Sequence, residues 1–320
     1  MILITEDVWG DELAALGDRY TVIYEPDLWK SPTRIRQALT GVQALVVRNR
    51  TKVDSAMIEA GKDLRIIARA GVGLDNIDIS SADSNGVAVS AALGVNAVSV
   101  AEHTVGLALA LTREVIPLDS DTKSGQWNRR AGVELAGKTW GLLGFGATAR
   151  STAQLLRGFG VNILAYDPYA QSTEAELRDL NADLVTAESV LSNADVISIH
   201  LPNTPQTAKF IDDRAIAAMK DGVFLINVGR GEVIDETALI AALKSGKVAA
   251  AGLDVRESEP PLLGELETLP NVVLTPHIAG ITKESQSRII KYLAADIDRA
   301  LNGERLNYAV GNVKSFAGQL

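Results

Sequence analysis

The 320-residue sequence predicts an α/β protein with two doubly wound parallel-sheet domains. Short β-branched apolar runs alternate with longer amphipathic segments along the chain, which is typical of βαβ units with helices on both faces of a sheet. Near-continuous apolar runs such as VFLINV at 223–228 suit strands that are buried on both faces. The runs are too many for one compact sheet, and a length of 320 residues favours about two domains.

The apolar runs fall into two series, separated near Asn96. The first series predicts strands near 2–5, 21–24, 44–47, 65–69 and 87–90. The second predicts strands near 139–143, 162–166, 196–201, 223–228, 248–254 and 271–275. One long helical pattern runs from Ala97 to about Lys123 and is followed by the loop SGQWNRRAG. Another runs from Thr282, a candidate N-cap, to Leu301.

Composition excludes several classes of function. With 31 Lys and Arg against 40 Asp and Glu, the net charge of −9 argues against nucleic acid or an acidic membrane as partner. The absence of Cys excludes disulfides, zinc–thiolate sites and a Cys nucleophile, and with three His we expect no metal site. The opening MILIT lacks the features of a signal peptide, and the apolar stretch at 101–112 is too short to span a bilayer. We therefore expect a cytoplasmic protein.

The segment TWGLLGFGATA at 139–149 reads as a strand followed by G-x-G-x-x-A and a helical pattern. Gly144 permits a tight turn and Gly146 lets the backbone approach a pyrophosphate, while Ala149 allows close packing of helix on strand. The start of the helix offers free N–H groups and the positive end of a dipole. Taken alone, the motif also fits a plain turn between a strand and a helix.

Asp167 strengthens the dinucleotide interpretation. It ends the next predicted strand, NILAYD, 23 residues after Gly144. A carboxylate at this position can accept hydrogen bonds from both ribose hydroxyls of adenosine and would repel a 2′-phosphate. The alternative is a turn residue before Pro168. The context favours a cofactor contact, and NAD over NADP.

Three later strands lead into polar residues of catalytic type, Arg230, Glu259 and His277. In an open parallel sheet, ligands bind beyond the carboxyl ends of the strands, so all three are expected beside the glycine turn. Arg can bind a substrate carboxylate bidentately, and a His paired with a carboxylate can donate a proton to a carbonyl oxygen. Each residue alone is better explained as a surface or turn residue. Together, behind a dinucleotide turn, they favour reduction of a 2-keto acid.

The sequence resembles the D-isomer-specific 2-hydroxyacid dehydrogenases, in particular the branch of phosphoglycerate dehydrogenase and glyoxylate/hydroxypyruvate reductase. The resemblance covers nearly the whole chain. Its motifs are RAGVGLDNID at 69–78, NAVSVAEHTVGLAL at 96–109, ELAGKTWGLLGFG at 134–146, NVGRGEVID at 227–235, GLDVRESEP at 252–260 and LTPHIAG at 274–280.

The resemblance implies roles for individual residues. Arg230 matches the substrate-binding arginine of the family, Glu259 its histidine-pairing acid and His277 its proton donor and acceptor. Asp254 matches a residue expected to contact the nicotinamide carboxamide. Substrate contacts are implied for Arg48, Val72 and Gly73. The other implied cofactor contacts are Gly144, Phe145, Gly146, Ala147, Thr148, Asp167, His200, Pro202, Thr204, Val228 and Gly280.

The resemblance also implies a Rossmann-type cofactor domain inserted into a flavodoxin-like substrate domain. We place the substrate domain at 1–97 plus 284–320 and the NAD-binding domain at 98–283. His103 then lies on a helix between the domains and is expected to be structural. Trp140 departs from the small aliphatic residue usual in the family, and the segment SAALGVN at 90–96 is less typical near the expected substrate pocket.

These observations predict an NAD-dependent 2-hydroxyacid dehydrogenase that acts as a homodimer on a small 2-keto or 2-hydroxy acid, without a nucleic-acid or membrane partner. An NAD-sensing corepressor without turnover is the alternative, and the intact Arg230, Glu259 and His277 speak against it. Chemistry like that of S-adenosylhomocysteine hydrolase fits the length and the lack of Cys poorly. Arg48 and Arg50 would suit a second anionic group, as in 3-phosphoglycerate or sulfolactate, but glyoxylate and hydroxypyruvate remain equally open.

Overall fold

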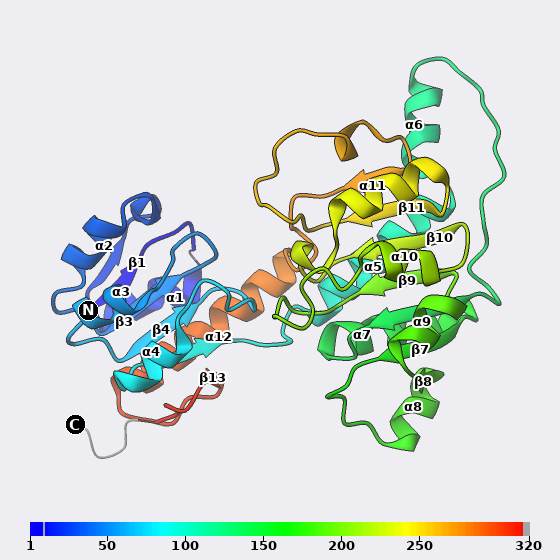
Figure 1. Ribbon diagram of the computed structural model, residues 1–320. Coiled ribbons are helices and arrows are strands. Elements are labelled where there is room, and N and C mark those ends of the chain that lie inside the picture. The colour runs from blue at the N-terminus through cyan, green and yellow to red at the C-terminus, as the bar shows by residue number, and fades with distance from the viewer. Residues whose placement is uncertain (9, 316–320) are drawn as a thin grey trace. The chain divides into compact units, whose positions relative to one another are not determined.

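The computed structural model describes residues 1–8 and 10–315 (Figure 1). The chain divides into two compact units, one of Met1–Asn96 with Lys283–Leu320 and one of Ala97–Thr282. Each unit holds one sheet with helices on both of its faces. The predicted α/β class with two doubly wound parallel sheets is therefore confirmed.

The first unit has a six-stranded sheet in the order β13-β5-β4-β3-β1-β2. Its strands are β1 (Ile2–Ile4), β2 (Val22–Tyr24), β3 (Ala44–Val47), β4 (Ile66–Arg69), β5 (Ala88–Ala91) and β13 (Ala309–Val310). The first five are parallel, and β13 pairs antiparallel with β5. The order 2-1-3-4-5 of the parallel strands is that of flavodoxin-like sheets.

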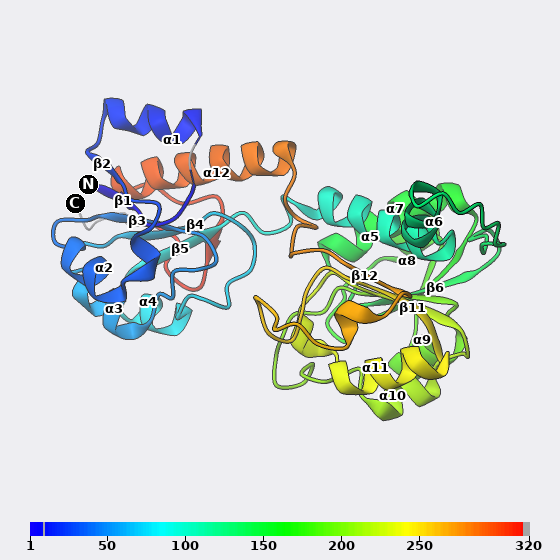
Figure 2. The same cartoon turned by 90° about the horizontal axis from the view of Figure 1, so that it is seen from above.

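Helices cover both faces of this sheet (Figure 2). They are α1 (Asp11–Ala15), α2 (Pro32–Ala38), α3 (Ser55–Ala60), α4 (Ile79–Ser84) and α12 (Lys283–Leu301), with 3₁₀ turns at Leu16–Asp18 and Leu28–Lys30. Side chains alternate between the faces along each strand. Ile2 and Ile4 pack with α1 and α12, whereas Leu3 packs with α2 and α3.

The second unit has a seven-stranded parallel sheet in the order β12-β11-β10-β9-β6-β7-β8. Its strands are β6 (Thr139–Leu143), β7 (Asn162–Tyr166), β8 (Ala182–Leu184), β9 (Val196–Ile199), β10 (Val223–Asn227), β11 (Val248–Leu253) and β12 (Val272–Leu274). Counted from β6, the order is 3-2-1-4-5-6 with one further strand. This is the strand order of dinucleotide-binding sheets, whose ligands bind where the order reverses, here between β6 and β9.

Two layers of helices enclose the seven-stranded sheet (Figure 2). The helices of this unit are α5 (Ala97–Thr112), α6 (Val115–Lys123), α7 (Ala147–Leu156), α8 (Glu174–Leu180), α9 (Ala187–Asn193), α10 (Asp213–Ala218) and α11 (Glu236–Ser245), with 3₁₀ turns at Arg157–Phe159, Gly231–Val233 and Leu266–Thr268. One core lies between the sheet and α5 and α7, and the other lies between the sheet and α9, α10 and α11.

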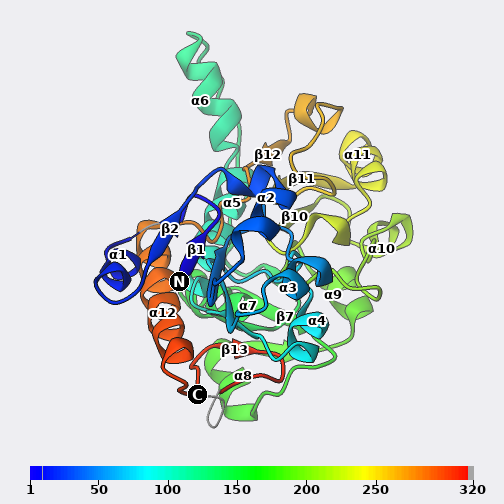
Figure 3. The same ribbon diagram turned by 90° about the vertical axis from the view of Figure 1, so that its left-hand side faces the viewer.

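One expectation about elements was wrong, and two short strands were not anticipated. The helical pattern at 97–123 is not one helix, because Glu114 adopts a left-handed conformation with φ 49° and separates α5 from α6. No residue of α6 is buried, and the helix stands away from the body of its unit (Figure 3). The short strands β8 and β13 at the sheet edges were not predicted. Among the described residues, no helix is both long and apolar enough to cross a membrane.

Candidate active site

The glycine turn after β6 has the backbone that a phosphate site needs. Gly144 has φ +91°, and a Cβ there would lie 3.0 Å from the carbonyl carbon and oxygen of His200, so both the conformation and the space require glycine. Gly146 precedes α7, and no side chain caps the N-terminus of that helix. The first N–H groups of α7 are therefore available to an anion. Ala149 is fully buried in the core beside the sheet.

Asp167 lies directly beside this turn, as predicted for a residue that contacts ribose. Its Oδ2 accepts a hydrogen bond of 2.9 Å from the amide of Phe145, and its Oδ1 accepts one of 2.9 Å from the amide of Tyr169. Each carboxylate oxygen retains a lone pair for a further donor. The side chain is thus held in place while it keeps acceptor capacity for hydroxyl groups.

Arg150 of α7 contacts the same region, although the sequence analysis did not anticipate it. Its Nε donates to the carbonyl oxygen of Phe145 at 2.9 Å, and its guanidinium lies 4.7 Å from the centre of the Phe145 ring. The two terminal nitrogens reach Ser172 and form an ion pair with Glu176. The contacts link the start of α7 to the segment that follows Asp167.

The three predicted catalytic residues lie beyond the carboxyl ends of β10, β11 and β12, which are neighbours in the sheet. Nδ1 of His277 donates to Oε2 of Glu259 at 2.7 Å, and the amide of Arg256 donates to the other oxygen at 3.2 Å. Burial raises the pKa of Glu259, but these hydrogen bonds and the positive charges of His277 and Arg230 outweigh it and hold that pKa below its usual value. The carboxylate is therefore ionised at neutral pH, facing the imidazole.

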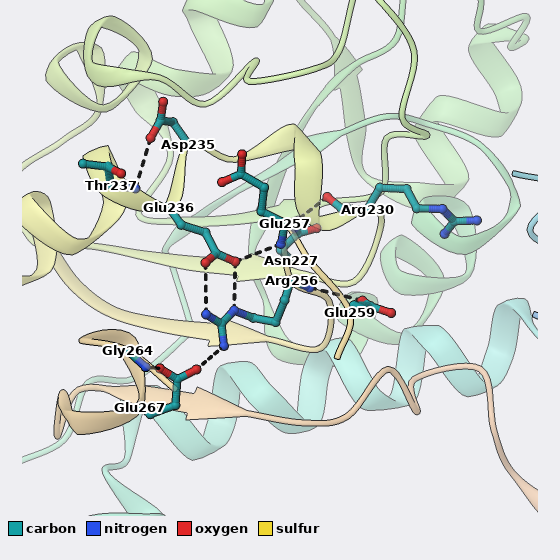
Figure 4. Close-up of polar contacts among 10 residues, drawn as sticks. All are labelled: Asn227, Arg230, Asp235, Glu236, Thr237, Arg256, Glu257, Glu259, Gly264 and Glu267. Atoms are coloured by element: carbon teal, nitrogen blue, oxygen red, sulfur yellow. Dashed lines mark hydrogen bonds and ion pairs between the residues drawn. The ribbon is translucent and has the colours of Figure 1, made fainter. Parts of the chain in front are cut away.

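An ion-pair cluster that the sequence analysis missed supports the loop of Glu259 (Figure 4). The guanidinium of Arg256 binds both oxygens of Glu236 at 2.8 and 3.0 Å and also contacts Glu267. The Glu236 and Glu267 carboxylates raise the pKa of Arg256 above its usual value. The amide of Glu257 also donates to Glu236 at 2.9 Å, so the loop is tied to the start of α11 by the side chain of Arg256 and by the backbone of Glu257.

Arg230 lies in the turn next to this loop. Gly231 passes so close to Arg256 that a Cβ would lie 1.9 Å from its carbonyl carbon, so only glycine fits there. The side-chain amide of Asn227 donates to the carbonyl oxygen of Arg230 at 2.9 Å. The guanidinium of Arg230 points away from the Arg256 cluster (Figure 4). The turn and the loop therefore keep Arg230 near Glu259.

The remaining cofactor candidates lie on the same edge of the sheet. His200 follows β9, and its Nε2 is 3.0 Å from Oγ of Ser198, which also accepts a hydrogen bond of 2.9 Å from the indole of Trp140. Burial lowers the pKa of His200 to about 3, so this imidazole is neutral. The unusual Trp140 is thus a buried hydrogen-bond donor as well as a packing residue. The other candidates here are Pro202, Thr204, Val228, Asp254 and Gly280, and their contacts with a cofactor stay predictions.

The predicted substrate residues Arg48, Val72 and Gly73 belong to the first unit, where they follow β3 and β4. The buried carboxylate of Glu6 accepts hydrogen bonds from the amides of Arg48, Arg50 and Thr51 at 2.8 to 2.9 Å. The guanidinium of Arg50 lies 4.9 Å from the centre of the Trp29 ring. Glu6 therefore fixes the loop that carries Arg48, a role that the sequence analysis did not assign.

The residues at this edge of the second unit fit a dinucleotide. The glycine turn, the uncapped start of α7 and the Asp167 carboxylate can hold a pyrophosphate and a ribose. Among residues 1–8 and 10–315, no group of three or more His, Cys, Asp or Glu could hold a metal ion.

Comparison with known proteins also indicates a dinucleotide-binding domain. Residues 105–279 match the model of the D-isomer specific 2-hydroxyacid dehydrogenase, NAD binding domain. A D-3-phosphoglycerate dehydrogenase from Archaeoglobus fulgidus is 44% identical over 271 residues, which are 84% of this chain and 51% of that protein. A hydroxypyruvate reductase from Thermotoga maritima is 46% identical over 253 residues, which are 78% of this chain and 81% of the reductase.

Solved structures also match the whole fold. The holo form of Rhodotorula graminis D-mandelate dehydrogenase superposes with a TM-score of 0.90 at 28% identity, and the match covers 98% of each chain. The chain spans about half the length of the curated phosphoglycerate dehydrogenases it matches. From the family model, these similarities and the geometry of the site, the chain belongs to the D-isomer-specific 2-hydroxyacid dehydrogenase family, and it carries the NAD-binding domain of that family.

Proposed function

We propose that the chain is an NAD-dependent oxidoreductase that interconverts a small 2-keto acid and the corresponding 2-hydroxy acid. The observation that carries the proposal is the hydrogen bond of 2.7 Å between His277 and Glu259. This pair lies beyond the carboxyl ends of the strands, on the same side of the sheet as the glycine turn. An acid–base pair in this place fits the reduction of a carbonyl, because the carbonyl oxygen must gain a proton as its carbon gains hydride.

Each residue has a role that follows from its chemistry. The nicotinamide, when bound, supplies or accepts the hydride. Nδ1 of His277 is occupied by Glu259, which stabilises the imidazolium and leaves Nε2 to exchange a proton with the substrate oxygen. Arg230 binds the substrate carboxylate through its planar fork. Asp167 and the glycine turn bind the adenosine ribose and the pyrophosphate.

The test measures the loss of NADH absorbance as the purified chain reduces a 2-keto acid. The acids to be compared are glyoxylate, hydroxypyruvate, phosphorylated hydroxypyruvate and a sulfonated analogue. Turnover of at least one of these acids is expected. NADH binding without turnover of any 2-keto acid would instead favour a nucleotide-sensing protein.

The choice of substrate rests on the loop of Arg48. The relatives named as D-3-phosphoglycerate dehydrogenase and hydroxypyruvate reductase differ in whether their named substrate carries a phosphate. We propose that the first unit is the substrate domain and that Arg48 faces the substrate. Because Arg50 stacks on Trp29, Arg48 is the better candidate of the two for a second anionic group. A higher kcat/KM for the phosphorylated or sulfonated acid than for hydroxypyruvate would show that such a group is recognised.

Glu259→Gln is expected to move the pH profile of the reductive reaction to lower pH. Reduction needs a proton from His277, and the negative charge of Glu259, 2.7 Å from Nδ1, favours the protonated ring. Glutamine removes that charge, so protonation of the ring loses this support. The measurement is kcat/KM against pH, with Glu257→Gln in the same loop as the control. A profile that stays in place would show that the pair does not control the proton.

Arg230→Lys is expected to raise KM for the keto acid and to lower kcat/KM by about tenfold or more, because an ammonium cannot reproduce the bidentate fork of a guanidinium. Steady-state kinetics at saturating NADH measure the change. The same substitution at the exposed Arg214 of α10 is the matched control and should leave kinetics unchanged. Wild-type kinetics for Arg230→Lys would remove this residue from the substrate site.

We further propose a homodimer. Val115 and Ile116 of α6 are exposed, and Trp127 in the following loop is 80% exposed. Exposed apolar side chains gathered on one projecting segment are typical of an interface. Light scattering is expected to give twice the mass of the chain, and Trp127→Glu should shift the equilibrium toward the monomer. A monomeric wild-type protein at micromolar concentration would contradict the proposal.

A further inference from the structure

One buried carboxylate holds the loop that carries His277. The side chain of Asp254 is 1% exposed. Its Oδ1 accepts hydrogen bonds from the hydroxyl of Thr275 at 2.6 Å and the amide of Ile278 at 2.9 Å, and its Oδ2 accepts one from the amide of Ala279 at 2.8 Å. These donors flank His277 on both sides. His277 itself has φ +56°, a left-handed conformation that the surrounding contacts must maintain in a residue other than glycine.

His103 contacts this arrangement from α5, an element more than a hundred residues earlier in the chain. Its Nε2 lies 3.1 Å from Oγ1 of Thr275 and 3.5 Å from Oδ1 of Asp254. No part of the proposed mechanism uses this contact, and the sequence analysis expected only a structural His here.

Counting the hydrogens assigns the donor in each of these contacts. Burial raises the pKa of Asp254, but the hydrogen bonds from His103, Thr275 and the loop amides outweigh it and hold that pKa below its usual value. The carboxylate is therefore ionised and can only accept. The one hydroxyl hydrogen of Thr275 is donated to Asp254. The oxygen of Thr275 must then accept from His103, so Nε2 of His103 carries a hydrogen.

We propose that His103 is a positioning residue, which donates its Nε2–H to Thr275 and so fixes the loop 275–279 in the conformation that directs His277 at Glu259. The hydrogen bond orients the Thr275 hydroxyl toward Asp254, and Asp254 in turn holds the amides on the far side of His277. Without the donor, Thr275 can rotate away and the loop can relax from its left-handed turn. The effect on turnover rests on the proposed function, whereas the effect on the geometry of His277 does not.

Nuclear magnetic resonance of the imidazole nitrogens tests the geometry directly, because the chain has only three His to assign. In the wild-type protein, His103 is expected as the Nε2–H form. In His103→Leu the His277 signals should shift, because the hydrogen bond from Nδ1 to Glu259 weakens. Thr275→Val should reproduce this change. His103→Gln should restore the wild-type signals of His277, because the Gln amide can donate from nearly the same position.

Kinetics provide the second readout. For His103→Leu, kcat of reduction is expected to fall about tenfold, as for small misplacements of a reacting group, while KM for the keto acid changes little because Arg230 is intact. Glu102→Gln, an exposed neighbour on α5, is the control. Unchanged His277 signals in a folded His103→Leu protein would overturn the proposal, as would His103→Gln behaving like His103→Leu. If the wild-type chain reduces no 2-keto acid, the proposed function fails, and the resonance experiment still decides the role of His103.

Discussion

His277→Ala is expected to lower kcat for the reduction of a 2-keto acid by about 100-fold or more, because general acid catalysis by a placed imidazole contributes about that factor. The affinity for NADH should be retained, since the glycine turn and Asp167 are untouched. Steady-state kinetics measure the first quantity, and quenching of protein fluorescence by NADH measures the second. The rate of the chemical step is checked with NADH deuterated at the transferred position.

The left-handed conformation of His277 calls for a second variant. Ala at φ +56° is strained, so a loss of activity in His277→Ala could include a disturbed loop. His277→Asn is the matched control, because Asn tolerates this conformation and cannot act as an acid near neutral pH. Equal losses in the two variants would assign the effect to the missing acid. If kcat is unchanged while the isotope effect shows that chemistry limits the rate, His277 is not the acid–base group.

The sequence was sufficient for most of the fold because buried parallel strands are continuous apolar runs. Strands β1 to β5, β6, β7 and β9 to β12 carry this signal. Strands β8 (ADL) and β13 (AV) do not, because β8 is interrupted by the charged Asp183 and β13 has only two residues. The break between α5 and α6 was missed for a different reason. Glu114 is a good helix former, so its left-handed conformation has no local signature.

Some residues of the candidate site could likewise be predicted from the sequence, and others could not. Arg230, Glu259 and His277 could be predicted because each follows a strand, and the carboxyl ends of parallel strands share one edge. The supporting contacts could not. Arg256 meets Glu236 from another loop, Glu6 binds the backbone of residues 48–51, and Arg150 reaches Glu176 across the turn. Such pairs join elements whose separation in the sequence carries no period or motif, so only the folded chain brings them together.

Asp167→Ala is expected to remove most of the preference for NAD over NADP. At an effective dielectric constant near 20, a 2′-phosphate beside this carboxylate is repelled by a few kcal/mol, which corresponds to about 100-fold in kcat/KM. The wild type should therefore strongly prefer NAD, and the variant should lose that preference because NAD binds more weakly and the 2′-phosphate of NADP is no longer repelled. The measurement is kcat/KM with each cofactor for both proteins.

The contacts of Asp167 make a second variant necessary. Its carboxylate accepts the amides of Phe145 and Tyr169, so Asp167→Ala removes an anchor of the glycine turn as well as a charge. Asp167→Asn removes the charge but keeps a side chain of the same size with one acceptor oxygen, so one of the two amide contacts can be retained. If repulsion sets the preference, Asn should relieve the rejection of NADP as fully as Ala does, with a smaller loss for NAD.

Arg150 limits how much the preference for NAD over NADP can change in these variants. Its guanidinium reaches the segment after Asp167, but Glu176, Ser172 and the carbonyl oxygen of Phe145 already occupy it. Neither variant of Asp167 should therefore gain strong NADP binding, because the paired Arg150 does not replace the lost repulsion with attraction. Glu176→Gln combined with Asp167→Asn should release Arg150 and raise kcat/KM for NADP above that of Asp167→Asn alone. Equal use of both cofactors by the wild-type protein would contradict the role of Asp167 itself.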